Sequence, residues 1–119
     1  MLAACTIGPE HLRELFEIEA AVFGESRKRT PADVFGSVNG RELLEKDFEH
    51  VEWRRFEDEL RCTNADDVVA YLTSIPPGEG ATSEELRQLR GAVDYRVRKG
   101  KGILRVTKGS GVFLARRAR

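Results

Sequence analysis

The spacing of apolar residues in the first third of the chain predicts a strand, a helix and a loop. The short uncharged run Leu2–Thr6 predicts a buried strand that ends at Gly8-Pro9. Pro9 suits the first turn of a helix, and apolar residues at helical spacing follow it as far as a stop at Gly24. The segment Glu25–Asp33 is polar and has no period, so we expect a loop there.

The middle of the chain predicts a short helix followed by a long extended segment. Asn39 and Glu42 have the spacing of a helix N-cap and its partner, and the helix that they start runs to Phe48. Val51–Thr63 alternates between apolar and polar residues, but the apolar phase changes once. This change predicts a bulge or kink near Arg54-Arg55.

Two further helices follow, and both have clear boundaries in the sequence. Thr63–Asp66 is a capping segment, and the helix that it opens ends at Pro76-Pro77 because proline cannot continue a helix. Thr82–Glu85 is a capping box that opens another helix, which Gly100 ends.

The C-terminal segment predicts a hairpin and completes an α+β fold. Ile103–Lys108 and Val112–Arg116 are apolar strands, and the intervening Gly109-Ser110-Gly111 is typical of a turn. The element order β-α-α-β-α-α-β-β predicts a small mixed β-sheet with this antiparallel hairpin, covered by four helices. The length of 119 residues predicts a single domain over 1–119. The large apolar residues that we expect in the core are Trp53, Phe56, Leu72, Leu104, Phe113 and Leu114.

Charge is unevenly distributed, although the chain is neutral overall. All twenty acidic residues lie at or before Asp94, whereas nine of the twenty basic residues lie in the segment Arg96–Arg119. One interpretation is a nucleic-acid-binding module that uses the basic 96–119 face. The other, which we favour, is that the basic stretch packs against the acidic body, because much of it is predicted strand. We therefore do not expect nucleic acid as a partner.

Residue types that carry chemistry are few. Cys5 and Cys62 are isolated thiols, which favours a reducing, cytoplasmic location. His11 and His50 lie on different predicted elements without further ligand spacing, so no metal site is expected. No apolar run is long enough to span a membrane. The glycines of residues 100–111 close a predicted helix or join strands, so we do not expect a phosphate-binding loop.

Four segments together have the order of a known family. They are Ala4–Leu12, Asn39–Glu52, Ala70–Ser74 and Thr107–Arg116. This order resembles the C-terminal part of class I S-adenosylmethionine-dependent methyltransferases, which close with a strand, two helices and a reversed final hairpin. The resemblance implies a partial Rossmann-like fold in which Ala4–Leu12 is the family's fifth strand entering its fifth helix. It also implies methyl transfer to an unidentified, small acceptor.

The resemblance does not extend to the part of the family that binds the methyl donor. That part holds S-adenosylmethionine with a glycine-rich loop and an acidic strand end, and neither pattern occurs in this chain. We therefore carry over no catalytic or cofactor-binding residue. We expect the chain alone to bind no S-adenosylmethionine and to lack catalysis.

The substrate side of the family falls within this chain. By position it includes the turn Thr6–Gly8 with His11, and the loop that runs to Phe35, so Thr6, His11 and Phe35 are the candidate site residues. Two of them have an alternative role. His11 could be an ordinary residue on a helix face, and Phe35 could be a core residue.

The strand Leu2–Thr6 bears on the expected partners. In the intact family this strand lies inside the sheet, so without its neighbour it would have an open edge beside apolar surface. We expect this surface to bind either the missing N-terminal methyltransferase half or a second copy in a homodimer. A dimeric structural or interaction domain without enzymatic activity is the remaining alternative function.

Overall fold

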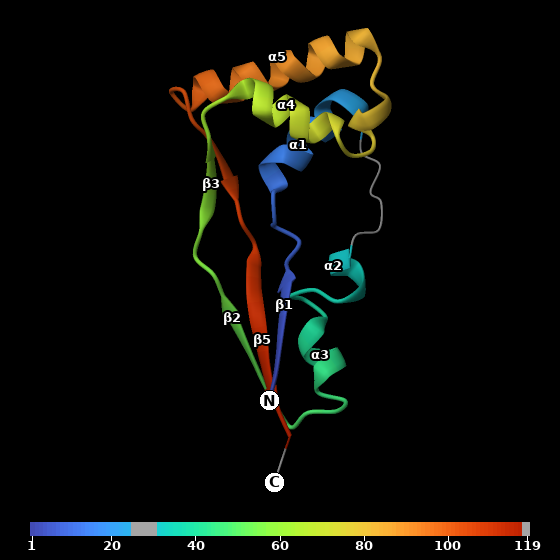
Figure 1. Cartoon of the computed structure of the whole chain (residues 1–119), viewed down its shortest axis with the longest axis vertical. Helices are drawn as coiled ribbons and strands as arrows, with labels where there is room; N and C mark the ends of the chain where they lie inside the picture. The colour runs from blue at the N-terminus through green and yellow to red at the C-terminus, as the bar shows by residue number, and fades with distance from the viewer. Residues whose placement is uncertain (25–30, 118–119) are drawn as a thin grey trace. The chain divides into compact units, whose positions relative to one another are not determined.

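The computed structural model describes residues 1–24 and 31–117, which form short helices and antiparallel sheets (Figure 1). The described residues divide into two units. Unit 1 comprises residues 1–11, 31–58 and 108–117, and unit 2 comprises residues 12–24 and 59–107. The α+β class expected from the sequence is confirmed.

Unit 1 is built on a three-stranded sheet with the order β1-β5-β2, in which β5 is the central strand (Figure 1). The strands are β1 (Leu2–Ile7), β2 (His50–Arg55) and β5 (Ser110–Arg116). Both outer strands pair antiparallel with β5, so β1 and β2 run parallel to each other. Two short helices, α2 (Pro31–Val34) and α3 (Gly40–Leu44), belong to the same unit.

Phe113 is the centre of the unit 1 core. Its side chain is 1% exposed, and its ring lies 4.6 Å from that of Trp53 and 5.7 Å from that of Phe35, centroid to centroid. The α3 residue Gly40 lies directly against the Phe113 ring, where any Cβ atom would collide with it. Because side chains alternate along a strand, Ala115 is buried on the same face of β5.

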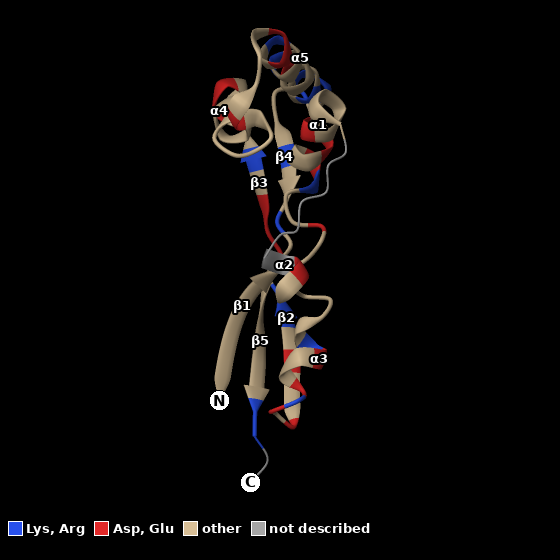
Figure 2. Cartoon of the chain, turned by 90° about the vertical axis from the view of Figure 1, so that its right-hand side faces the viewer, with Lys and Arg blue, Asp and Glu red and all other residues tan. Residues whose placement is uncertain are grey.

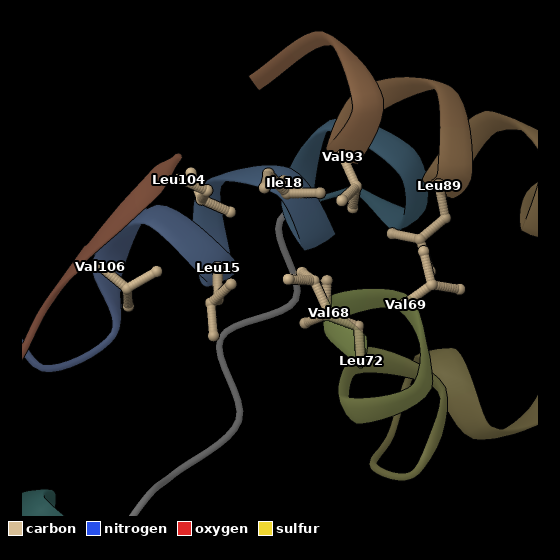
Figure 3. Close-up of a cluster of buried hydrophobic side chains, with 9 residues drawn as sticks. All are labelled: Leu15, Ile18, Val68, Val69, Leu72, Leu89, Val93, Leu104 and Val106. Atoms are coloured by element: carbon tan, nitrogen blue, oxygen red, sulfur yellow. The ribbon is translucent and has the colours of Figure 1, made fainter. Parts of the chain in front are cut away.

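Unit 2 is mainly helical. Its helices are α1 (Arg13–Phe23), α4 (Ala65–Thr73), the 3₁₀ turn η1 (Gly78–Gly80) and α5 (Ser83–Lys99), and β3 (Glu59–Cys62) pairs antiparallel with β4 (Leu104–Thr107). Its core gathers one apolar face from each of α1, α4, α5 and β4 (Figure 3). The buried side chains are Leu15, Ile18, Val68, Val69, Leu72, Leu89, Val93, Leu104 and Val106.

The expected mixed sheet and C-terminal hairpin are wrong. Every strand pairing among the described residues is antiparallel, and β4 and β5 are not partners, because β4 pairs with β3 whereas β5 pairs with β1 and β2. The physical reason lies in burial. Leu104 and Val106 of β4 are buried in the helical core of unit 2, whereas Phe113 of β5 is buried in unit 1. The two apolar runs therefore belong to different cores.

The phase change expected in Val51–Thr63 is a complete break between two strands. Residues 56–58 separate β2 from β3, a little beyond the expected kink at Arg54-Arg55. Phe56 lies in this break and is 50% exposed, so its expected burial is wrong. The burial of Leu72, Leu104 and Phe113 is confirmed, and Trp53 and Leu114 are half-buried.

The four expected helices correspond to α1, α3, α4 and α5. The ends of α4 and α5 lie close to their signals in the sequence, whereas α1 begins at Arg13 instead of Pro9 and α3 ends at Leu44 instead of Phe48. Asn64 caps α4 by accepting a hydrogen bond from the backbone N–H of Asp66 at 2.8 Å. Thr82 and Glu85 form the capping box of α5. The short α2 occupies the end of the expected loop Glu25–Asp33, of which residues 25–30 lie outside the described chain.

Candidate functional site

The turn that follows β1 is held by the residue that precedes β5. The backbone N–H of Gly8 donates to the carbonyl of Gly109 at 2.7 Å, and the N–H of Gly109 donates to Nδ1 of His11 at 3.1 Å. The turn closes on itself because the N–H of His11 donates to the carbonyl of Gly8 at 3.2 Å. Gly109 therefore fixes both ends of the turn.

The Glu10 side chain packs against both Gly8 and Gly109. A Cβ atom at either position would lie 2.5 Å from a Glu10 carboxylate oxygen, and at Gly8 it would also meet the Ser37 hydroxyl. Neither glycine has a positive φ, so a larger residue there would have to displace the Glu10 side chain but would not strain the backbone. The carboxylate of Glu10 is thereby placed beside the turn that carries His11.

A loop between α2 and α3 covers the outer side of the same turn. The Thr6 hydroxyl donates to the carbonyl of Phe35 at 2.7 Å, and the N–H of Ser37 donates to the carbonyl of Ile7 at 3.1 Å. The Asn39 side chain fixes this loop by accepting from the N–H of Gly36 at 2.7 Å. Thr6 and Phe35, two of the expected site residues, are thus brought into direct contact.

The three candidate residues have different surroundings. The Phe35 ring packs edge-on against Phe113, as expected for a core residue, and the Thr6 hydroxyl is engaged with the backbone of the loop. His11 is half-buried, and only its Nδ1 atom is hydrogen-bonded within the described residues. His11 is therefore the candidate with a polar atom available to a ligand.

The charge state of His11 is set by its surroundings. Burial removes water from the imidazole, and the nearby Lys108 cation disfavours a second positive charge, so the pKa of His11 lies below its ordinary value of 6.5. The Glu10 carboxylate acts in the opposite direction with the smallest effect of the three. His11 is accordingly a neutral imidazole at neutral pH.

Glu10, Ser37, Asn39 and Gly109 belong to this site but were not expected from the sequence. The hydrogen bond between Gly109 and His11 joins residues 98 positions apart, so no local sequence pattern predicts it. Asn39 carried a signal, since it stands at the expected N-cap. In the structure, however, its side chain makes no capping bond and instead holds the loop before α3.

Several basic residues of the C-terminal stretch have partners within their own units. Arg96 pairs with Glu17 at 2.8 Å, Arg105 with Glu59 at 2.7 Å and Lys108 with Asp58 at 3.1 Å. Two further cations lie over aromatic rings, Lys99 over Tyr95 and Arg117 over Phe48. This pattern agrees with the interpretation that the basic stretch packs against acidic residues.

Comparison of the chain with protein-family models and with curated protein sequences finds no match. None of the helices in residues 1–24 and 31–117 is long and apolar enough to cross a membrane. Over the same residues, no three His, Cys, Asp or Glu side chains come together as a set of metal ligands.

Proposed function

We propose that this chain is the C-terminal, acceptor-side part of a class I S-adenosylmethionine-dependent methyltransferase. The observation that carries the proposal is the arrangement of unit 1. Three of the four segments on which the resemblance rests, Ala4–Leu12, Asn39–Glu52 and Thr107–Arg116, lie in this unit except for the end residues Leu12 and Thr107. Their central strand β5 runs antiparallel to β1, although the final hairpin that the resemblance implies does not form among the described residues.

The turn after β1 supports an acceptor-side role for this part. It is the position at which the resemblance places the substrate side, and it holds His11 with a polar atom that has no partner among the described residues. The reaction of the intact family would be methyl transfer from S-adenosylmethionine to a small acceptor. Two free cysteines, Cys5 and Cys62, support a reducing, cytoplasmic location.

The chain by itself would not hold the methyl donor. In the described residues no glycine-rich loop leads from a strand into a helix, since Gly8 stands alone in the turn after β1. Such a loop lets the backbone approach a nucleotide-like cofactor. We propose that an N-terminal methyltransferase half supplies this loop and that the isolated chain lacks catalysis.

Calorimetry tests this division of roles. Titration of the chain with millimolar S-adenosylmethionine should give no saturable heat. Binding tighter than about 100 µM, which corresponds to about −5.5 kcal/mol, would contradict the division.

The methyltransferase assignment itself needs a second experiment. The gene segment immediately upstream should encode a strand followed by a glycine-rich loop and a helix. A protein that joins this segment to the chain should bind S-adenosylmethionine saturably, with the chain alone as the matched control. An upstream segment without such a loop, or a joined protein that gives no saturable heat, would overturn the proposal.

A further inference from the structure

The hydrogen bond from Gly109 determines which nitrogen of His11 carries the proton. A neutral imidazole has one N–H donor and one bare nitrogen acceptor. Nδ1 accepts the N–H of Gly109 at 3.1 Å, so it is the bare nitrogen and the proton resides on Nε2. At Nε2, His11 can therefore donate a hydrogen bond but cannot take up a proton.

The Nε2–H group is available to a ligand. The His11 side chain makes no other hydrogen bond within the described residues, and its half-buried ring has no buried polar atom left without a partner. Nε2 is thus in reach of solvent. The group is preorganised, because Gly109 holds the ring from its other nitrogen while the Gly8 carbonyl holds the His11 backbone.

The Nε2–H donor of His11 requires an acceptor atom in the ligand, such as an oxygen with a free lone pair. Two charged side chains act on the imidazole, Lys108 and Glu10, and the effect of Lys108 is the larger of the two. Lys108 is paired with Asp58 at 3.1 Å, so its ammonium group is held in place. The Asp58 and Glu10 carboxylates offset this cation, so the choice of an oxygen as the ligand atom rests on the Nε2–H donor, which requires an acceptor, and not on net charge.

We propose that His11 binds the methyl acceptor by donating its Nε2–H to an oxygen of that molecule, and that it does not act as a general base. This inference rests on the proposed function. It assigns the acceptor to molecules with a carboxylate or carbonyl oxygen that can accept this hydrogen bond. The proton stays on His11 throughout, so any proton released from the acceptor must leave by another route.

Nuclear magnetic resonance of the ¹⁵N-labelled chain tests the tautomer first. At a pH above the ordinary imidazole value of 6.5, long-range ¹H–¹⁵N correlation should show a bare Nδ1 and a protonated Nε2 for His11. His50 is exposed and its side chain has no hydrogen bond within the described residues, so it serves as the control ring in the same sample. A protonated Nδ1 in His11, or a tautomer mixture like that of His50, would overturn the proposal.

Acetate serves as the probe for the ligand. Added acetate should shift the Nε2–H resonance of His11 saturably, whereas chloride at equal ionic strength should not. His11→Asn keeps an oxygen that can accept a hydrogen bond from the Gly109 N–H, but it removes the Nε2 donor. The amide resonance of Gly109 should therefore stay near its wild-type position, whereas the acetate response should be lost. His11→Ala should shift the Gly109 amide resonance and abolish the acetate response. His50→Asn should leave both the Gly109 resonance and the acetate response unchanged.

The acetate response decides the second half of the proposal. A response that survives in His11→Asn, or a wild-type chain that responds equally to acetate and chloride, overturns it. None of these measurements involves methyl transfer or S-adenosylmethionine. Their failure is therefore distinguishable from failure of the methyltransferase proposal, which the joined protein tests.

Discussion

At the scale of single residues, Phe113 is the side chain on which unit 1 depends most. It is fully enclosed by Trp53, Phe35 and the backbone of Gly40. Phe113→Ala should lower the free energy of unfolding by about 3–5 kcal/mol, because it removes buried apolar surface and leaves a cavity. Urea unfolding monitored by tryptophan fluorescence measures this loss in unit 1, since Trp53 is the only tryptophan and lies beside Phe113.

The matched control for this substitution is Phe56→Ala. Phe56 is 50% exposed in the break between β2 and β3, so its loss should cost less than about 1 kcal/mol. If Phe113→Ala costs no more than Phe56→Ala, the core assigned to unit 1 is wrong.

Phe113 and Phe56 also show what the sequence could and could not predict about single residues. Both are large apolar residues in alternating segments, and both were expected in the core. Alternation predicts which face of a strand a residue occupies, but it does not show where the strand leaves its sheet. The site has the same limit. The sequence predicts the turn and His11, but it cannot predict Gly109, whose role depends on a distant contact.

At the scale of elements, Glu14 joins the start of α1 to the end of β4. Its carboxylate accepts hydrogen bonds from both the backbone N–H and the hydroxyl of Thr107, each at 2.8 Å. Burial of the carboxyl disfavours its charge and is the largest single effect. The two Thr107 hydrogen bonds, aided by Arg13, outweigh it and hold the pKa of Glu14 below the ordinary 4.5.

This lowered pKa makes the link sensitive to acid. A carboxyl whose folded pKa is depressed stabilises the fold above its unfolded pKa, and this stabilisation is lost as the pH falls through the folded value. Glu14→Gln should therefore be less stable than the wild type at neutral pH, and the difference should shrink below pH 4.5. Denaturant unfolding across this range measures it. A difference that is constant with pH would show that the carboxylate charge contributes nothing.

Helices and strand pairings differed in how far the sequence could predict them. The ends of α4 and α5 follow from Asn64, from Pro76-Pro77 and from the Thr82 capping box, which act on neighbouring backbone groups. Strand partners follow from burial, which local signals do not describe. Gly109 was expected in a hairpin turn because of its composition, but in the structure its backbone binds the β1 turn instead.

At the scale of the whole molecule, the outer edge of β1 is the surface through which copies of the chain are expected to associate. The N–H of Ser37 occupies the Ile7 carbonyl at one end of this edge. Backbone groups of alternate residues point to the same edge, so those of Ala3 and Cys5 face outward as well, and no other described strand pairs with them. The strand carries no charge to protect it (Figure 2).

We predict a homodimer through this edge. Light scattering in the micromolar range should give about twice the chain mass of 13.4 kDa. Ala3→Pro removes an outward N–H without disturbing the pairing with β5, so it should give the mass of one chain. Ala3→Val keeps the N–H and should remain dimeric. A wild-type monomer, or a dimer that persists in Ala3→Pro, would contradict the prediction.

The central place of β5 has a consequence for synthesis on the ribosome. The strands β1 and β2 leave the ribosome before β5, which is the sheet partner of both, and Leu2 pairs with Ala115. Until β5 emerges, the apolar face of β1 has no native partner, and such exposed strands are prone to aggregate. The pairing of β3 with β4 is complete by Thr107 and can form first. A holdase chaperone would therefore protect this protein most when the residues up to Thr107 have emerged from the ribosome and β5 has not.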